Sequence, residues 1–310
     1  MIYTLTLNPA VDLELQIPQF QFNSTIQAEQ SRFDCGGKGF NVSRMLNNLG
    51  VDNIAMGFIG GDNGQKLKSQ LTQLGIKTLL TEIKEETRTN VSIRTQAQQH
   101  IKINTSGPNV SKNELDNLLA LIKCNLTAGD WWVLAGSLPL GIDNNIYAEL
   151  ISLIKSAGSF VMLDTSGEAL KQGCLAQPTL VKPNLEEAMQ LFTLTSEQIE
   201  DPALLTGVLS TSGAKDLLIS LGSQGVLLVT DTLYKKIESP KIKEVNPTGA
   251  GDAMVAAIVW RLSIGDSLEQ AVLYGVAAGA STANCTGTNL ATLKQIQQRL
   301  PTTEKETSAH

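Results

Sequence analysis

Strand-like and helix-like segments alternate along most of the chain, and this alternation restricts the possible folds more than any other feature. After residue 107 the apolar, strand-like runs lie at 131–135, 160–164, 179–181 and 216–220, followed by a hairpin-like pair at 226–229 and 233–237. Helix-like segments lie at 111–123, 144–157, 185–193, 202–212, 250–262 and 267–283. The alternation predicts an α/β fold with a doubly wound, mostly parallel sheet, in which ligands bind beyond the carboxyl ends of the strands.

Two stretches in the first third of the chain interrupt this pattern. Residues 54–59 and 64–74 still read as a strand and a helix, but residues 11–34 and 87–105 read as short strands that alternate with polar residues. Weakly apolar strands do not suit the middle of a parallel sheet. We therefore expect one domain over residues 1–310, with a small inserted β-sheet that forms a lid from about 11–34 and 87–105.

Charge and hydropathy exclude several classes of partner. The 310 residues carry a net charge of −6, with a pI near 5.1, which argues against nucleic acid or an anionic membrane as the main partner. No apolar run is long enough to cross a bilayer, and the first residues lack the pattern of a signal peptide. Anionic small molecules remain possible ligands if basic residues gather locally.

Cysteine and histidine usage argues against a metal centre of the zinc type. The four cysteines are far apart in sequence, and the only histidines are His100 and His310. This usage favours a reducing, cytoplasmic location. We expect His100 to lie exposed in a hairpin without a catalytic role, and we expect the polar tail after Pro301 to fray.

A glycine motif near the C-terminal end, residues 246–252, carries the strongest indication of chemistry. Pro247 keeps the preceding chain in a loop, and the unbroken apolar run after Asp252 predicts a buried helix. Gly249 and Gly251 therefore lie at a helix N-terminus, where free backbone N–H groups and the helix dipole favour an anion. A carboxylate beside an anion site is consistent with a base that deprotonates an attacking hydroxyl. The alternative is a glycine turn whose acid caps the helix.

A second glycine loop, residues 36–41, opens a helix that is expected to end near Leu49. It carries Lys38 and Asn41 but matches neither the phosphate-loop pattern nor the dinucleotide-binding pattern. Seen alone, it is equally compatible with a tight turn and a solvated lysine.

Taken together, these motifs resemble the ribokinase-like (pfkB) carbohydrate kinase family from Tyr3 to about Leu300. The two glycine motifs occur in the expected order and separation. The segments 4–12, 86–90 and 136–139, together with Lys38, resemble the branch that contains 1-phosphofructokinases, tagatose-6-phosphate kinases and minor 6-phosphofructokinases.

The resemblance implies a role for each matching residue. Asp252 would be the catalytic base, and the backbone N–H groups of Gly249, Ala250 and Gly251 would bind the transferring phosphoryl group. Residues implied to bind the sugar phosphate are Asp12, Gly37, Lys38, Asn41, Arg88, Asn90 and Ser137, with Lys38 and Arg88 on its phosphate. Residues implied to bind ATP are Lys182, Asn184, Ser220, Gly222, Ser223, Gln224, Gly225, Thr248, Gly251 and Asn284. Glu187 would act on Mg²⁺ through water, and helix residues 275–284 would cover the adenine.

The resemblance also implies a homodimer that forms through the lid.

Two departures from the family pattern bear on the site. Many relatives have Asp-Thr where this chain has Asn246-Pro247-Thr248, which puts a nearby monovalent-cation site in doubt. Lys102 stands where many relatives carry an acid, and it adds a positive charge close to the lid.

The activity that the resemblance implies is ATP-dependent phosphorylation of a ketohexose monophosphate to the bisphosphate, with ATP and Mg²⁺. Fructose 1-phosphate, converted to fructose 1,6-bisphosphate, is the first choice of acceptor. Fructose 6-phosphate or tagatose 6-phosphate, phosphorylated on carbon 1, are the alternatives. A non-catalytic sensor of nucleotide or sugar phosphate is the rival from another class, while a nicotinamide oxidoreductase lacks its fingerprint.

Overall fold

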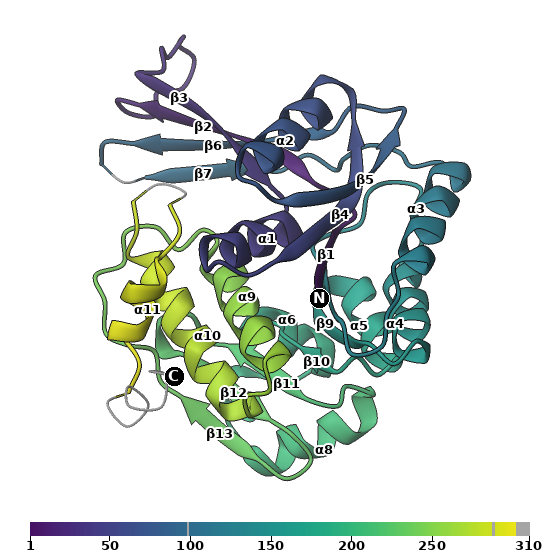
Figure 1. The fold of residues 1–310 in the computed structure, drawn as a ribbon. Coiled ribbons are helices and arrows are strands. Elements are labelled where there is room, and N and C mark those ends of the chain that lie inside the picture. The colour runs from purple at the N-terminus through teal and green to yellow at the C-terminus, as the bar shows by residue number, and fades with distance from the viewer. Residues whose placement is uncertain (98, 287–288, 302–310) are drawn as a thin grey trace.

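The computed structural model describes residues 1–97, 99–286 and 289–301, and most of this chain surrounds one large sheet (Figure 1). In the described part, nine strands pair in the order β13-β12-β11-β10-β9-β8-β1-β4-β5. Their bounds are β1 Ile2–Thr6, β4 Asn53–Gly60, β5 Lys77–Ile83, β8 Trp131–Ala135, β9 Phe160–Asp164, β10 Leu180–Val181, β11 Leu217–Ser220, β12 Val226–Val229 and β13 Tyr234–Ile237. Pairing is parallel from β5 to β11 and antiparallel for β12 and β13, which confirms the predicted doubly wound sheet and its terminal hairpin.

Helices cover both faces of this sheet, because successive strand side chains point to opposite faces and both sets are apolar. On β8, Trp132 and Leu134 join one buried cluster, while Trp131 and Val133 join the other. The first cluster is covered by α3 Lys112–Cys124, α4 Ile146–Ser156, α5 Gly167–Leu175, α6 Leu185–Phe192, α7 Ser196–Ile199 and α8 Pro202–Ser212. The other face carries α1 Lys38–Asn48, α2 Gly61–Gln73, α9 Ala250–Ser263, α10 Leu268–Ala283 and α11 Leu293–Gln298.

Four helices differ from the sequence expectation. The helices α5, α7 and α11 were not predicted, and α2 begins at Gly61 rather than at residue 64. Helix α5 contains Gly167 and Gly173, which favour a loop on propensity alone. It forms because Leu170 and Cys174 are buried against the sheet. The tail after Pro301, which includes His310, lies outside the described residues. Among the helices of the described residues, none is long and apolar enough to cross a membrane.

The two polar-alternating stretches form the expected second sheet, which projects from the body (Figure 1). Its strands are β2 Ala10–Ile17, β3 Gln30–Gly36, β6 Arg88–Thr95 and β7 His100–Ile103, in the order β3-β2-β6-β7. We call this sheet the lid. It joins segments that are far apart in sequence, because β2 pairs with β6 in parallel, with Asp12 opposite Asn90.

Strand register gives the lid two unlike faces. Phe33, Leu13, Val91 and Ile103 lie in one row across the four strands, and Leu15, Ile93 and Ile101 lie in the next row of the same face. The opposite face carries polar residues, which are Asp12, Asn90, Glu14, Ser92, Lys102, Arg94 and His100. The polar face is the one that contributes to the cavities described below.

Candidate active site

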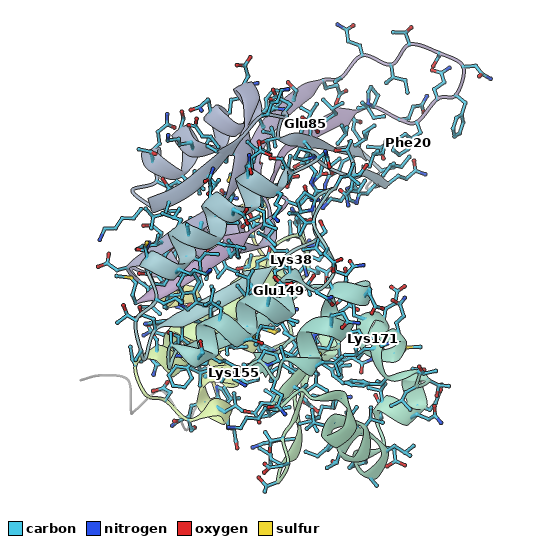
Figure 2. All side chains as sticks on the ribbon, turned by 90° about the vertical axis from the view of Figure 1, so that its right-hand side faces the viewer. Phe20, Lys38, Glu85, Glu149, Lys155 and Lys171 are labelled. Carbon is cyan, nitrogen blue, oxygen red and sulfur yellow. The ribbon has the colours of Figure 1, made fainter. Side chains whose placement is uncertain are left out.

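Two adjacent cavities open beyond the carboxyl ends of the main-sheet strands, as the fold class predicts. One is polar, has a volume of about 490 Å³, and lies between the lid and the main sheet. The other is mostly apolar, has a volume of about 590 Å³, and lies between η1 Gly222–Gln224 and α10. Ser220 and Gly251 line both cavities. In Figure 2, the labelled Lys38 lies between the lid, next to which Phe20 marks the segment that joins β2 to β3, and the part of the body that carries Lys171.

Gly249 and the first turn of α9, as far as Asp252, form the boundary between the two cavities. Gly249 is the N-cap of α9 and has φ of 81°, a left-handed conformation that glycine adopts without a steric penalty. Asp252 lies in the first turn of α9 and does not cap it, so the acidic-cap alternative is wrong. The following residues, 253–259, are buried, which fixes this helix end against the sheet.

Asp252 is a buried carboxylate held by one neighbour from the other glycine loop. Its side chain lines the polar cavity with only 8% of the residue exposed, and Asn41 Nδ2 donates to its Oδ2 at 2.8 Å. Burial raises the pKa of Asp252, although Lys38 acts in the opposite direction. A carboxyl with a raised pKa, aimed into a polar cavity, is suited to accept a proton.

Asp164 joins the two predicted lysines, and it is the main site residue to which no role was assigned from the sequence. Its Oδ1 lies 2.7 Å from Lys38 Nζ and 3.4 Å from Lys182 Nζ. Burial opposes ionisation of Asp164, but Lys182 and Lys38 together lower its pKa. Lys38 is desolvated, yet the charges of Asp164 and Asp252 raise its pKa on balance. The available signal was the position of Asp164 at the carboxyl end of a buried strand.

The lid contributes a hydrogen-bonded pair and two cations to the polar cavity. Asn90 Nδ2 donates to Asp12 Oδ1 at 2.8 Å, and burial raises the pKa of Asp12. Arg88 donates to the backbone oxygens of Thr105, at 2.6 Å, and Asn8, at 3.0 Å, and burial lowers its pKa. Lys102 lines the same cavity.

Asn8 links the segment that follows the lid strand β7 to the main body of the protein. Its Nδ2 donates to Ser106 O at 3.0 Å, to Leu138 O at 3.1 Å and to Ser137 Oγ at 3.3 Å. Asn8 therefore positions Ser137, and its backbone oxygen positions Arg88. Asn8 was given no role from the sequence.

Asn184 and Glu187 lie at the N-terminus of α6, where each caps the other. Asn184 Oδ1 accepts from Glu187 N at 2.8 Å, and Glu187 Oε2 accepts from Asn184 N at 2.8 Å. Both residues line the polar cavity. Glu187 therefore uses one carboxylate oxygen, Oε2, to cap its own helix while the residue lines the polar cavity.

The apolar cavity contains only some of the residues expected to bind ATP. Ser220, Gly222, Ser223 and Gly225 line it together with the small-residue face of α10. Gln224 and Asn284 do not line either of the two cavities among the described residues. Gln224 Oε1 accepts from Lys236 at 3.3 Å, and the Asn284 amide donates to Lys243 O at 2.7 Å and accepts from Arg299 at 2.9 Å.

The structure brings the remaining predicted residues together around the polar cavity. These residues are Asp12, Gly37, Lys38, Asn41, Arg88, Asn90, Ser137, Lys182, Asn184, Glu187, Thr248, Gly249, Gly251 and Asp252. Ala250 lines the apolar cavity beside them. His100 lies on β7, where its Nε2 is 2.7 Å from Ser92 Oγ, and it lines no part of the polar cavity.

Comparison with known proteins identifies the family. Residues 2–295 match the model of the pfkB family of carbohydrate kinases. The chain belongs to this family. It is an enzyme that transfers a phosphoryl group from ATP to a sugar, and the family fold agrees with the doubly wound sheet and its lid.

Several known proteins of this family are similar over nearly their whole length. A 1-phosphofructokinase of Borreliella burgdorferi is 35% identical over 284 residues, which are 91% of this chain and 92% of that protein. A tagatose-6-phosphate kinase of Staphylococcus epidermidis is 36% identical over 263 residues, which are 83% and 84% of the two chains. Phosphofructokinase-2 of Escherichia coli, in a crystal structure with potassium, has a TM-score of 0.89 and 30% identity, covering 96% of this chain and 97% of that one.

Proposed function

We propose that this kinase transfers the γ-phosphoryl group of ATP to a ketohexose monophosphate, and that fructose 1-phosphate is converted to fructose 1,6-bisphosphate. The observation that carries the proposal is the placement of buried Asp252 where a polar, cation-lined cavity meets an apolar one. Similarity to proteins named 1-phosphofructokinase and tagatose-6-phosphate kinase supports a phosphorylated ketohexose. Fructose 6-phosphate and tagatose 6-phosphate, phosphorylated on carbon 1, are the alternative acceptors.

The sugar phosphate would occupy the polar cavity beneath the lid. Lys38 and Arg88 would bind its phosphate, Arg88 through a planar guanidinium that suits phosphate geometry. Asp12, Asn41 and the backbone at Gly37 would bind the sugar hydroxyls, with Asn90 holding Asp12 at 2.8 Å and Ser137 closing the other side. Four cations, Lys38, Arg88, Lys102 and Lys182, line this cavity together with the carboxylates of Asp12, Asp164, Glu187 and Asp252. Cations that can bind an anionic acceptor are therefore gathered here, although the chain has a net charge of −6.

The nucleotide would place its base in the apolar cavity and its phosphates toward Gly251. The small residues of α10, which include Gly279, Ala280 and Ala283, leave a flat apolar surface that suits an adenine ring. Lys182, Asn184 and Thr248 line the polar cavity at the side where the phosphates would enter. Gln224 and Asn284 would act indirectly, because their side chains bind other parts of the protein.

The transfer step follows from these positions. Asp252 accepts the proton of the acceptor hydroxyl as that oxygen forms a bond to the γ-phosphorus. The bond from this phosphorus to the bridging oxygen breaks, and ADP leaves with the electron pair. The N–H groups of Gly249 and Gly251, at the N-terminus of α9, would stabilise the negative charge on the transferring group. The N–H group of Ala250, which was expected to contribute, is not free in this structure, because it donates to Pro247 O at 3.1 Å.

The oxygen ligands present fit a magnesium ion that is held mainly by water and phosphates. Glu187 lines the polar cavity, and Asp164 Oδ2 is a buried acceptor without a hydrogen-bond partner among the described residues. Magnesium usually keeps several waters and takes one or two carboxylates plus substrate phosphates. Glu187 would hold the ion through water, and the ion would neutralise phosphate charge.

We also propose that two copies associate through their lids in the cytoplasm, where ATP is available. The apolar face of the lid leaves Phe33 53%, Ile101 43% and Ile103 52% exposed. An apolar face of this size on a thin sheet is expected to be covered by another surface. The polar face lines the acceptor cavity, so lid pairing would leave that cavity open to substrate.

A coupled assay of ADP release with MgATP tests the proposal. The panel contains fructose 1-phosphate, fructose 6-phosphate, tagatose 6-phosphate, free fructose, ribose and adenosine. We expect the highest kcat/KM for fructose 1-phosphate. Preference for an unphosphorylated sugar would remove the assigned role of Lys38 and Arg88, and binding without turnover on any compound would favour a non-catalytic sensor.

A further inference from the structure

A lid arginine reaches across to the loop that precedes the catalytic motif. Arg94 projects from β6, and its Nη2 donates to Asn246 Oδ1 at 3.0 Å. On the lid side, Arg94 Nε lies 3.2 Å from Glu14 Oε1, and the two side chains are only 25% and 29% exposed. Partial burial reduces solvent screening of this pair, so the guanidinium is held in a defined direction. Arg94 is therefore fixed to the lid at one end and to the body at the other.

Asn246 connects three parts of the site. It is 5% exposed, and its Oδ1 also accepts from Thr248 N at 3.1 Å, which shapes the turn into Gly249. Its backbone N–H donates to Ala283 O, at the end of α10, at 3.0 Å, and Val245 N donates to the same oxygen at 2.8 Å. A displacement of Asn246 would therefore move the entry to the catalytic loop.

The apolar cavity is lined by residues on both sides of Asn246. Glu244 and Pro247 flank it in sequence and line that cavity, and Ala283, which accepts from its N–H, lines it as well. A ligand in this cavity contacts the two chain segments that hold Asn246. Binding of a ligand in the apolar cavity therefore affects the position of Asn246, whose Oδ1 accepts from Arg94. The connection consists of covalent bonds along the chain and two backbone hydrogen bonds.

We propose that Arg94 is a positioning residue that couples the lid to nucleotide binding through Asn246. A nucleotide in the apolar cavity holds Asn246 in place, and the bonded Arg94 then holds the lid over the acceptor cavity. Coupling is reciprocal, so a closed lid also strengthens nucleotide binding. The inference rests on the proposed function only in taking the apolar cavity as the nucleotide site.

Hydrogen exchange of the lid strands β6 and β7, measured with and without the non-hydrolysable analogue MgAMP-PNP, tests this coupling. No sugar is added, so the result does not depend on the identity of the acceptor. In the wild-type protein, we expect the analogue to slow lid exchange about fivefold or more. In Arg94→Met, lid exchange should not respond, while slowed exchange of the loop at residues 248–252 shows that the nucleotide still binds.

Glu14→Gln is the matched control, because it removes the ion pair of Arg94 and leaves the hydrogen bond to Asn246. Its lid should still respond to the analogue, because Arg94 remains part of β6 and keeps its hydrogen bond to Asn246. Arg94→Lys keeps the charge but loses the forked guanidinium, and it serves as the second variant if Arg94→Met folds poorly; its response should be reduced. A wild-type response in either Arg94 variant, or no lid response in the wild-type protein with the loop protected, would overturn the proposal.

Titration of fructose 1-phosphate in the presence and absence of AMP-PNP gives a second readout that a merely structural role would not change. The analogue should tighten sugar-phosphate binding about fivefold or more in the wild-type protein and less than twofold in Arg94→Met, with single-ligand affinities similar. Failure of fructose 1-phosphate to bind at all would count against the proposed acceptor, and the exchange experiment would still decide the coupling.

Discussion

Asp252 and Asp164 are both buried carboxyls, yet their surroundings give them opposite protonation behaviour. Asp164 has two lysines within 3.4 Å, which lower its pKa, whereas burial dominates at Asp252 and raises its pKa. Separation of pKa values between neighbouring acids is typical of sites that move protons. The two residues therefore call for different predictions.

Asp252→Asn should abolish most of the activity without weakening the fold. We expect kcat to fall by about a hundredfold to ten-thousandfold, because the general base is lost, while ATP and sugar-phosphate binding persist. The pKa of Asp252 is higher in the folded state than in the unfolded state, where it is about 3.9. The folded state therefore becomes less stable as the pH rises from the unfolded-state pKa to the folded-state pKa. At pH 7 the variant should therefore melt at the same or a higher temperature. Near-normal kcat would exclude Asp252 as the base.

The raised pKa of Asp252 also predicts a pH profile. The base must be ionised to act, so kcat/KM for the sugar phosphate should decrease on the acid side, with an inflection above the ordinary aspartate value of about 3.9. The profile is measured in saturating MgATP. An acid limb that persists unchanged in the residual activity of Asp252→Asn would assign the ionisation to another group.

Asp164→Asn should destabilise the protein at neutral pH. Loss of this charge removes the ion-pair partner of Lys182, whose side chain is 5% exposed, and removal of one partner from a buried pair costs about 3 kcal/mol. Because the pKa of Asp164 is lowered on folding, its contribution is present above the unfolded value and is lost as pH falls. In urea denaturation, the free energy of unfolding of Asp164→Asn should therefore lie well below that of the wild-type protein at pH 7. This difference should narrow below about pH 4.

Glu82→Gln is the matched control for that substitution. Glu82 pairs with Lys68 on the surface, where the side chains are 65% and 47% exposed. Exposed pairs contribute about 1 kcal/mol or less, so this change should be close to neutral. Equal effects of the two substitutions would contradict the role assigned to the buried cluster.

Helices α9 and α10 pack so closely that a glycine is required between them. A Cβ at Gly275 would lie 2.4 Å from Ile258 Cγ1 and 3.1 Å from Met254 O. Gly275→Ala should therefore destabilise the protein by about 1 to 3 kcal/mol through overpacking. Gly207→Ala, in the exposed face of α8, where the added carbon meets no atom of the described residues within 4 Å, should instead stabilise it by about 0.5 to 1 kcal/mol. Thermal melting of both variants checks the opposite signs.

Long, periodic or unusual segments could be predicted from sequence, whereas contacts between distant segments could not. The apolar run of α9 and the polar alternation of β6 gave the right elements because local pattern and burial agree there. Short α7 and α11 were missed because four and six residues carry little periodicity. Asp164 bridges two lysines, and Gln224 and Asn284 hydrogen-bond to residues outside the two cavities. These contacts depend on how distant segments pack, which residue identity alone does not show.

At the scale of the whole molecule, the two-faced lid predicts the oligomeric state. Its polar face is used by the acceptor cavity, so the apolar face, with Phe33, Ile101 and Ile103 exposed, is available for a second copy. A charge placed there would have to be desolvated on association, which costs several kcal/mol. Ile103→Asp should therefore shift the protein from dimer to monomer in sedimentation velocity measured at micromolar concentration.

Leu175→Asp provides the control for this shift, because Leu175 is 59% exposed at the end of α5, outside the lid. It should leave the mass unchanged. If lid pairing also stiffens the sheet, the monomeric Ile103→Asp variant should have a raised KM for the sugar phosphate, because the lid carries Asp12, Arg88 and Lys102, while the KM for ATP should change little. A wild-type protein that sediments as a monomer, or a dimer that survives Ile103→Asp, would place the interface elsewhere.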